Sequence, residues 1–323
     1  MTRKHTKHPP LLSFSVRFFI VCGLFLYLYY TLDWKKFAAI IFASDARWFV
    51  AAFAAYGVTT LLSMVRWQIL LSACKAPIRF LRTAQLTMVG LFANAFLPGV
   101  MSGDIFKILY ATRDMPKIKP TVVMSIIMER LLGFVAMFLV STALILSRYR
   151  ALTSETATRY AVYFYFISFG AILFLLALGA WKKSAKFFPF LKKLPWQDTL
   201  REAVHAYRFF LSHPTCFWGG ITLSIVAHFS LMMMSYFVSN ALGMNLDFWD
   251  LAAVLPLVML VTLIPATPSG LGVREVAFQH FLLFAGMTQE ASVALSLGGF
   301  SVVLAWNLIG GLVYLGMNRK SPA

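Results

Sequence analysis

The chain has 323 residues, of which 60% are hydrophobic and only 13% are charged, and its mean hydropathy is +0.75. This composition leaves too little polar surface for a water-soluble protein and predicts a polytopic membrane protein. The formal net charge of +17 comes from short Lys and Arg clusters between apolar runs. No basic face or nucleic-acid motif accompanies them, so nucleic acid is not an expected partner.

Six apolar segments are long enough to cross a bilayer core of about 30 Å. In chain order they cover residues 13–32, 48–73, 120–146, 160–181, 214–242 and 291–316. Basic residues precede the first segment, but no small-residue cleavage site follows it, so we expect a retained helix rather than a signal peptide. The fold class is therefore predicted to be all-α, with about six full spans.

Two further apolar stretches are interrupted by Pro and Gly. Residues 83–97 and 251–264 are each about fifteen residues long, roughly 22 Å as helix, and the segments that follow them, 104–113 and 271–285, are shorter or more polar. Because such helices are too short to cross the bilayer, they predict two re-entrant hairpins. Paired broken helices in the two halves of a chain are typical of a transporter's substrate site.

The order of these segments divides the chain into two similar halves. Pseudo-repeats 13–146 and 160–316, joined by an outer loop at 147–159, each run span, span, re-entrant hairpin, span. A cytoplasmic N-terminus places most Lys and Arg residues, including the cluster at 182–193, on the inner side, as the positive-inside rule requires. We therefore predict a single integral-membrane domain, 1–323, built as an inverted-topology repeat with both termini cytoplasmic.

Ionisable residues flank the two breaks at membrane depth. An isolated charge there costs at least about 2.5 kcal/mol, so these side chains should pair or line water. The helix N-termini after Gly103 and Gly272 are expected to present backbone N–H donors to a phosphate or carboxylate. The predicted substrate-binding residues are Gly103, Asp104, Glu129, Arg130, Ser269, Gly270, Arg274 and Glu275.

Several polar residues have structural interpretations. We expect Arg66 to snorkel to the interface and Lys107 to be solvated by the cytoplasm. His228 is expected to be a hydrogen-bonded packing residue, and Asn94 to join helices. For Glu129 and Arg130, a structural ion-pair role and a functional role are equally open.

Four motifs, Arg66–Leu71, Asn94–Gly99 with Ser102–Asp104, Met128–Gly133 and Pro268–Glu275, resemble the lysylphosphatidylglycerol synthase transmembrane-region family, also called the flippase-like domain. The resemblance covers nearly the whole chain. The resemblance implies a role in lipid movement, because in the two-domain synthases of that family this domain is taken to move aminoacylated phosphatidylglycerol to the outer leaflet. A separate soluble domain makes that lipid. The chain ends at Ala323, directly after its last span, so we expect it to lack the synthase domain. Departures from the family's pattern at Met101, Ser102, Lys107 and Ser269 leave the substrate open.

We expect the chain to translocate an anionic or zwitterionic lipid, of the phospholipid or polyprenyl-phosphate type, between the leaflets of a bacterial inner (plasma) membrane. Arg274 and the helix N-termini would hold the phosphate with help from Arg130, while Asp104, Glu129 and Glu275 would balance charge or carry a coupling proton. Membrane lipids are the expected substrates, and a soluble lipid-modifying enzyme is an open partner. No catalytic residue, metal site, cofactor or nucleotide-binding motif is predicted. A membrane transferase acting on a lipid-phosphate and a scaffold for a lipid enzyme are the alternatives.

Overall fold

The structure is a computed structural model that describes residues 23–24, 26–96, 102–180, 209–262 and 270–318. Every regular element in these ranges is a helix, which agrees with the all-α prediction. Five helical stretches are long and apolar enough to cross a membrane: Ala46–Ala73, Pro116–Ser147, Thr156–Phe174, Pro214–Ala241 and Gln289–Met317. They correspond to five of the six predicted spans. The first predicted span, 13–32, falls largely outside the described residues.

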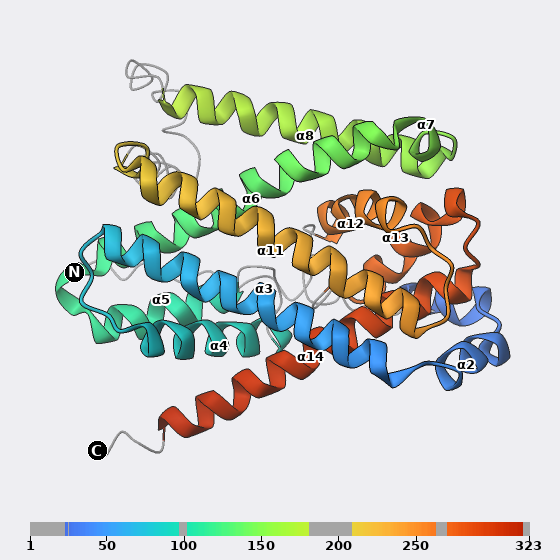
Figure 1. Cartoon of the computed structure of the whole chain (residues 1–323), viewed down its shortest axis with the longest axis horizontal. Helices are drawn as coiled ribbons and strands as arrows, with labels where there is room; N and C mark the ends of the chain where they lie inside the picture. Colours follow the sequence, from blue (N-terminus) through green and yellow to red (C-terminus); the bar gives the residue numbers. More distant parts are fainter. Residues whose placement is uncertain (1–22, 25, 97–101, 181–208, 263–269, 319–323) are drawn as a thin grey trace, which may run out of the picture.

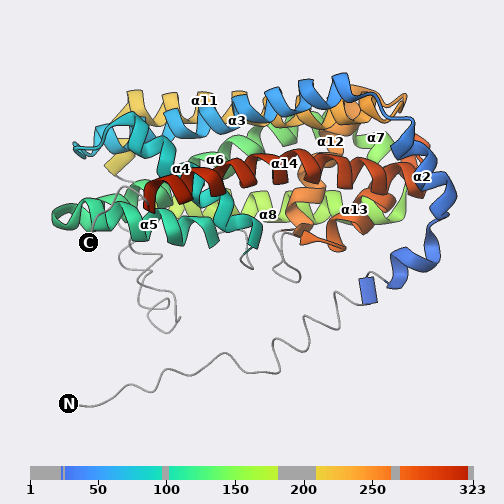
Figure 2. The same ribbon diagram turned by 90° about the horizontal axis from the view of Figure 1, so that it is seen from below.

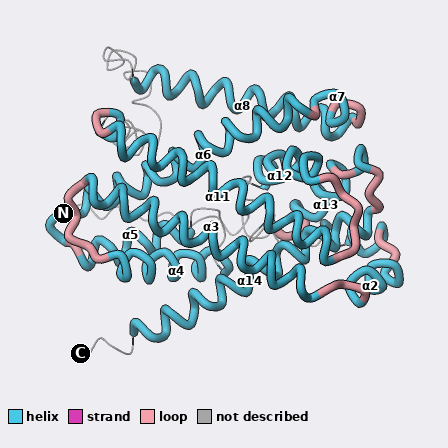
Figure 3. Tube along the Cα trace, in the orientation of Figure 1, coloured by secondary structure: helices cyan, strands magenta, loops and turns pink. Residues whose placement is uncertain are grey.

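Short connections join most consecutive helices (Figures 1 and 3). The longer helices are α3 (Ala46–Ala73), α6 (Lys119–Ser147), α8 (Thr156–Ala180), α11 (Pro214–Ala241) and α14 (Gln289–Asn318). The shorter ones are α2 (Trp34–Phe42), α4 (Phe80–Phe96), α5 (Ser102–Asp114), η1 (Pro116–Ile118), α7 (Tyr149–Leu152), α12 (Phe248–Thr262), α13 (Val273–Phe281) and η4 (Leu283–Ala285). The predicted breaks are residues 97–104 and 265–272. Their residues 97–101 and 265–269 lie outside the described residues, between α4 and α5 and between α12 and α13.

Local sequence explains where several helices begin. Asp33 and Asp45 accept the N–H groups of Lys35 at 3.0 Å and Arg47 at 2.9 Å, as N-cap residues do. Pro214 opens α11, where the N–H that proline lacks would have no helical partner. Gly272 precedes α13 with a φ of +84°, a left-handed conformation that glycine adopts without steric cost.

Helices α4 and α5 form an antiparallel pair. At one end Arg82 Nε donates to Asp114 Oδ2 at 2.7 Å, and at the other the Gly103 N–H donates to Asn94 Oδ1 at 2.6 Å. Asn94 thus joins the two helices, as predicted. Between these contacts the helices run close together, because a Cβ on Gly90 would lie 3.0 Å from the Cγ of Lys107. Glycine therefore sets how tightly this pair packs.

Helices α12 and α13 also pack against each other. A Cβ on Gly270 would lie 3.2 Å from the Thr262 side chain, so the chain returns to the end of α12 before α13 begins. In Figure 1 the α4–α5 pair and the α12–α13 pair lie toward opposite ends of the long axis. Figure 2 shows α3 and α11 together along one face, with α5 and α13 on the side away from them.

Contacts between helices follow the same scheme in both halves of the chain. Helix α3 packs most extensively against α11, α4 packs on α14, and α12 packs on α6. In the same way α5 contacts α6, and α13 contacts α14. Each of these contacts in the first half therefore has a counterpart in the second.

Candidate functional site

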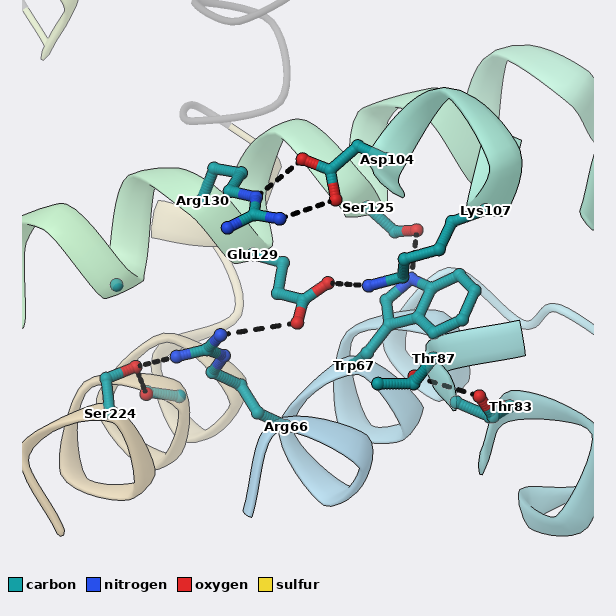
Figure 4. A network of polar contacts seen from close by, with 12 residues as sticks. Arg66, Trp67, Thr83, Thr87, Asp104, Lys107, Ser125, Glu129, Arg130 and Ser224 are labelled. Carbon is teal, nitrogen blue, oxygen red and sulfur yellow. Dashed lines mark hydrogen bonds and ion pairs between the residues drawn. The ribbon is translucent and has the colours of Figure 1, made fainter. Parts of the chain in front are cut away.

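Glu129 on α6 is the centre of a buried ionic cluster, shown in Figure 4. Its Oε2 accepts from the Lys107 Nζ of α5 at 2.6 Å, and its Oε1 accepts from the Arg66 Nη2 of α3 at 3.2 Å. Arg66 Nη1 in turn donates to the Ser224 Oγ of α11 at 2.7 Å. One carboxylate thus connects α6 with α5 and α3 and, through Arg66, with α11.

Lys107 and Arg66 are not where the sequence predicted them. Lys107 is only 5% exposed, and its Nζ lies 4.1 Å from the ring centroid of Trp67, a cation–π distance. The Arg66 side chain is 12% exposed and is bound to Glu129. The predictions that Lys107 is solvated and that Arg66 snorkels are therefore wrong. Both cations stay inside because packing of α5 and α3 on α6 brings them to the same carboxylate.

Trp67 fixes one side of this cluster. It is fully buried together with Leu71 and Leu86, and its Nε1 donates to the Ser125 Oγ of α6 at 3.1 Å. A buried indole N–H needs such a partner, and the bond sets the register of α3 against α6. The Lys107 ammonium consequently meets an immobilised aromatic face.

Arg130, the residue after Glu129, binds a different partner on the same helix, α5. Its Nε and Nη2 donate to the two Asp104 oxygens at 2.5 and 2.7 Å, a bidentate pair. Because Glu129 holds Lys107 and Arg130 holds Asp104, both residues attach α5 to α6. The Asp104 side chain is 8% exposed and that of Arg130 is 37% exposed, so the guanidinium is the outer member of the pair.

A second cluster lies where α13 meets α14. Arg274 Nη2 donates to Glu275 Oε1 at 2.6 Å, and the Ser296 Oγ of α14 donates to the same oxygen at 2.7 Å. Arg274 Nε also donates to Ser296 Oγ at 2.8 Å, and its guanidinium carbon lies 4.8 Å from the Phe300 ring centroid. The Arg274 side chain is 17% exposed and that of Glu275 is 2% exposed. Here too the carboxylate is the deeper partner.

The backbone donors expected at the two helix starts are already occupied. The Gly103 N–H binds Asn94 Oδ1, and the Gly272 N–H donates to Glu275 Oε2 at 2.6 Å. Side chains therefore satisfy one N–H group at each helix start, and the prediction that these helix starts bind an anion stays a prediction for the N–H groups that follow. Gly270 is buried beside Thr262, and Ser269 lies outside the described residues.

Two adjoining cavities connect the clusters. One, of about 270 Å³, is lined by Arg66, Glu129 and Arg130, and the other, of about 220 Å³, is lined by Arg274, Ser296 and Phe300. Both are also lined by Met137, His228, Leu231, Met259 and Thr262. Thr262, the last residue of α12, stands in this shared wall, and Arg130, which binds Asp104 at the start of α5, lines the first cavity.

His228 stands in that wall. Its Nε2 lies 3.1 Å from the Gly133 carbonyl oxygen, which agrees with the predicted role of a hydrogen-bonded packing residue. A larger groove, of about 710 Å³, runs along α6 and α11, contains no residue of the two charged clusters, and is lined mainly by apolar residues such as Leu139, Val140 and Phe229. Arg148 and Trp249 line it as well.

The sequence analysis missed Arg66, Lys107, Ser224 and Ser296 as members of the two clusters. For the two cations a signal existed, because an ionisable residue within an apolar helix is a functional-site candidate by default. For the two serines no such signal exists, since serine is common at helix contacts in membranes. Among the described residues, no three His, Cys, Asp or Glu side chains come together as metal ligands would.

Bilayer-length apolar helices around buried, paired charges define a multi-pass membrane protein. The chain matches the family described as the lysylphosphatidylglycerol synthase TM region over residues 14–311 of 323, and it belongs to that family. The resemblance seen in the sequence motifs is thereby confirmed. Membership indicates a role connected with membrane lipids, and in the synthase this region is normally fused to an enzyme domain. No curated protein and no solved structure matches the chain.

Proposed function

We propose that the protein moves a phosphate-bearing lipid between the two leaflets of a bilayer, with the headgroup passing through the two joined cavities. The observation that carries this proposal is the pair of cavities with a shared wall, one lined by Arg66 and Arg130 and the other by Arg274. Arginine suits phosphate because its planar guanidinium donates two parallel hydrogen bonds. A headgroup could therefore find a donor at each end of the path.

We further propose that α4–α5 and α12–α13 are re-entrant hairpins that enter from opposite sides. Their helices have 17, 13, 15 and 9 residues, whereas a full span needs about 20. The opposite ends that they occupy in Figure 1, and the matching contacts of the two halves, support an inverted-topology repeat. In this scheme both termini are cytoplasmic, and the membrane is a bacterial inner membrane.

The hydrocarbon chains would stay outside the polar path. The apolar groove along α6 and α11 offers them a surface, with Arg148 and Trp249 where α6 ends and α12 begins. Arginine and tryptophan are typical of the membrane–water interface. Asp104, Glu129 and Glu275 would orient the arginines, since each carboxylate lies deeper than its cavity-lining arginine.

The test is transport by the purified protein in liposomes that contain a fluorescent phosphatidylglycerol. Accelerated exchange between leaflets relative to protein-free liposomes supports the proposal, and Arg274→Ala should abolish the acceleration while still inserting. Arg150→Ala, which removes an exposed arginine far from the cavities in the sequence, is the matched control. No acceleration by the folded wild-type protein contradicts transport. Chemical conversion of the lipid would instead favour the transferase. The absence of both transport and conversion would favour the scaffold.

A further inference from the structure

The charges of the two clusters do not balance. Among the described residues, the clusters hold one more cation than carboxylates: the cations are Arg66, Lys107, Arg130 and Arg274, and the carboxylates are Asp104, Glu129 and Glu275. Arg130 and Arg274 each have their own carboxylate, whereas Arg66 and Lys107 share Glu129. The excess positive charge therefore belongs to the cluster around Glu129.

The excess charge lies next to the larger of the two cavities. Arg66 and Arg130 both line it, and the side chain of each is more exposed than that of its carboxylate, 12% against 6% and 37% against 8%. Buried Arg66 Nε has no hydrogen-bond partner. Arg130 uses Nε and Nη2 for Asp104, so its third guanidinium nitrogen, Nη1, takes no part in that bidentate pair. The cavity wall thus presents two guanidinium groups together with the Glu129 carboxylate, which is the less exposed partner of Arg66.

An uncompensated cation at membrane depth is costly, and a bound anion removes that cost. A cationic headgroup in the same cavity would raise it, because like charges brought together inside an interface cost several kcal/mol. A zwitterion would leave the excess charge unbalanced. The electrostatics of the cavity therefore discriminate between headgroups by their net charge.

We infer that the cavity lined by Arg66 and Arg130 is a site for one singly charged phosphodiester, and that the protein selects lipids of net charge −1 over zwitterionic and aminoacylated, cationic lipids. This inference rests on the proposed function, because it names the substrate class of the same path. Arg66 is the specificity-determining residue, since it carries the excess charge. The preferred substrate would thus differ in charge from the aminoacylated lipid that the family name implies.

Binding can be measured without transport, as the stabilisation of detergent-solubilised protein by added lipid. Phosphatidylglycerol, phosphatidylethanolamine and lysylphosphatidylglycerol supply net charges of −1, 0 and +1 with similar chains, and inorganic phosphate tests whether the anion alone suffices. We expect phosphatidylglycerol to bind at least about tenfold more tightly than the cationic lipid, a difference of about 1.4 kcal/mol. Inorganic phosphate should raise the melting temperature much less, because it lacks the apolar contacts of the chains.

Arg66→Gln should remove the preference for phosphatidylglycerol over phosphatidylethanolamine, and Arg66→Lys should retain it. Lys117→Gln, which removes an exposed positive charge at the base of α5, is the charge-matched control and should retain it too. Equal binding of the three lipids by the wild-type protein, or an unchanged preference in a folded Arg66→Gln variant, would overturn the inference. Stabilisation by phosphate equal to that by phosphatidylglycerol would overturn the lipid assignment.

The inference and the proposed function fail in different ways. Transport that ignores headgroup charge would refute the inference and leave transport intact. A charge-selective binding result without any transport would refute the proposed function and leave the site standing. The comparison of lipids on the wild-type protein needs no variant, so a failure of Arg66→Gln to fold does not prevent the test.

Discussion

The cluster around Glu129 and the cluster around Glu275 both bury a carboxylate that is less exposed than its arginine partner, but they are built differently. Glu129 binds cations from α3 and α5, and through Arg66 it reaches α11. Glu275 binds its sequence neighbour Arg274 and the Ser296 hydroxyl of α14. The first cluster therefore joins four helices, whereas the second positions one arginine through contacts on α13 and α14.

Because the two clusters are built differently, substitutions in them should have different effects. Loss of the Glu129 carboxylate removes contacts among four helices at once and leaves two buried cations without a counter-charge. Loss of the local pair leaves one cation that already lines a cavity and that other contacts hold in place. We therefore expect substitutions in the first cluster to lower stability, and substitutions in the second to act mainly on transport.

The largest effect is expected from Glu129→Gln. Removing one partner of a buried ion pair costs about 3–5 kcal/mol in the free energy of unfolding, and here Arg66 and Lys107 both lose their carboxylate. Glu275→Gln, the matched change in the second cluster, should cost less. Thermal unfolding of both variants in the same detergent measures the two losses of stability. An equal decrease in melting temperature would contradict the expected difference between the two clusters.

A double-mutant cycle sharpens the same point. Combining Glu129→Gln with Lys107→Met should destabilise the protein by less than the sum of the single changes, because the second substitution removes one of the stranded cations. Additive losses would mean that the two side chains do not interact in the membrane-inserted protein.

Arg274→Ala is expected to reduce transport at least about tenfold, equivalent to about 1.4 kcal/mol, with little loss of stability. Glu275 would keep its bonds from the Gly272 N–H and Ser296. Arg130→Ala should be the less stable variant, because Asp104 loses both hydrogen bonds of a bidentate pair, whereas Glu275 keeps two other donors. Flux and melting temperature should be measured on the same preparations. A larger stability loss for Arg274→Ala would contradict the assignment of the second cluster to transport.

Ser296→Ala tests the contact between α13 and α14 at smaller cost. It removes the hydrogen bonds to Arg274 and Glu275, each worth about 0.5–1.5 kcal/mol and up to about 3 for a charged partner. Ser301→Ala, on the same helix, loses only a bond to the Gly298 carbonyl oxygen and is the control. If both variants melt at the same temperature, Ser296 does not hold Arg274 in place.

Labelling of single cysteines compares the two hairpins without disturbing either cluster. In a background with Cys22, Cys74 and Cys216 replaced by Ser, Lys117→Cys beside α5 and Asn245→Cys beside α12 occupy exposed positions. An impermeant thiol reagent should modify Lys117→Cys from the cytoplasmic side only and Asn245→Cys from the outer side only. Labelling of both from one side would refute the inverted arrangement.

Local sequence signals are enough to predict where helices form and where they break. Long apolar runs mark the spans, and the Pro and Gly residues at 97–103 and 265–272 separate α4 from α5 and α12 from α13, because both signals act over a few neighbouring residues. The same local signals placed Asp104, Glu129, Arg130, Arg274 and Glu275 within or beside apolar helices. Membership of the family also followed from local motifs.

Which charges pair depends instead on how the helices pack. Arg66 and Glu129 are 63 positions apart, and Arg66 and Ser224 are 158 apart, so their contact depends on how α3, α6 and α11 pack rather than on any local pattern. The same packing placed Lys107 against Trp67 instead of in water, and it gave the Gly103 N–H to Asn94 rather than to a ligand. In a medium without water, a buried cation must be satisfied by whichever carboxylate the fold brings within reach, and sequence spacing cannot specify that partner.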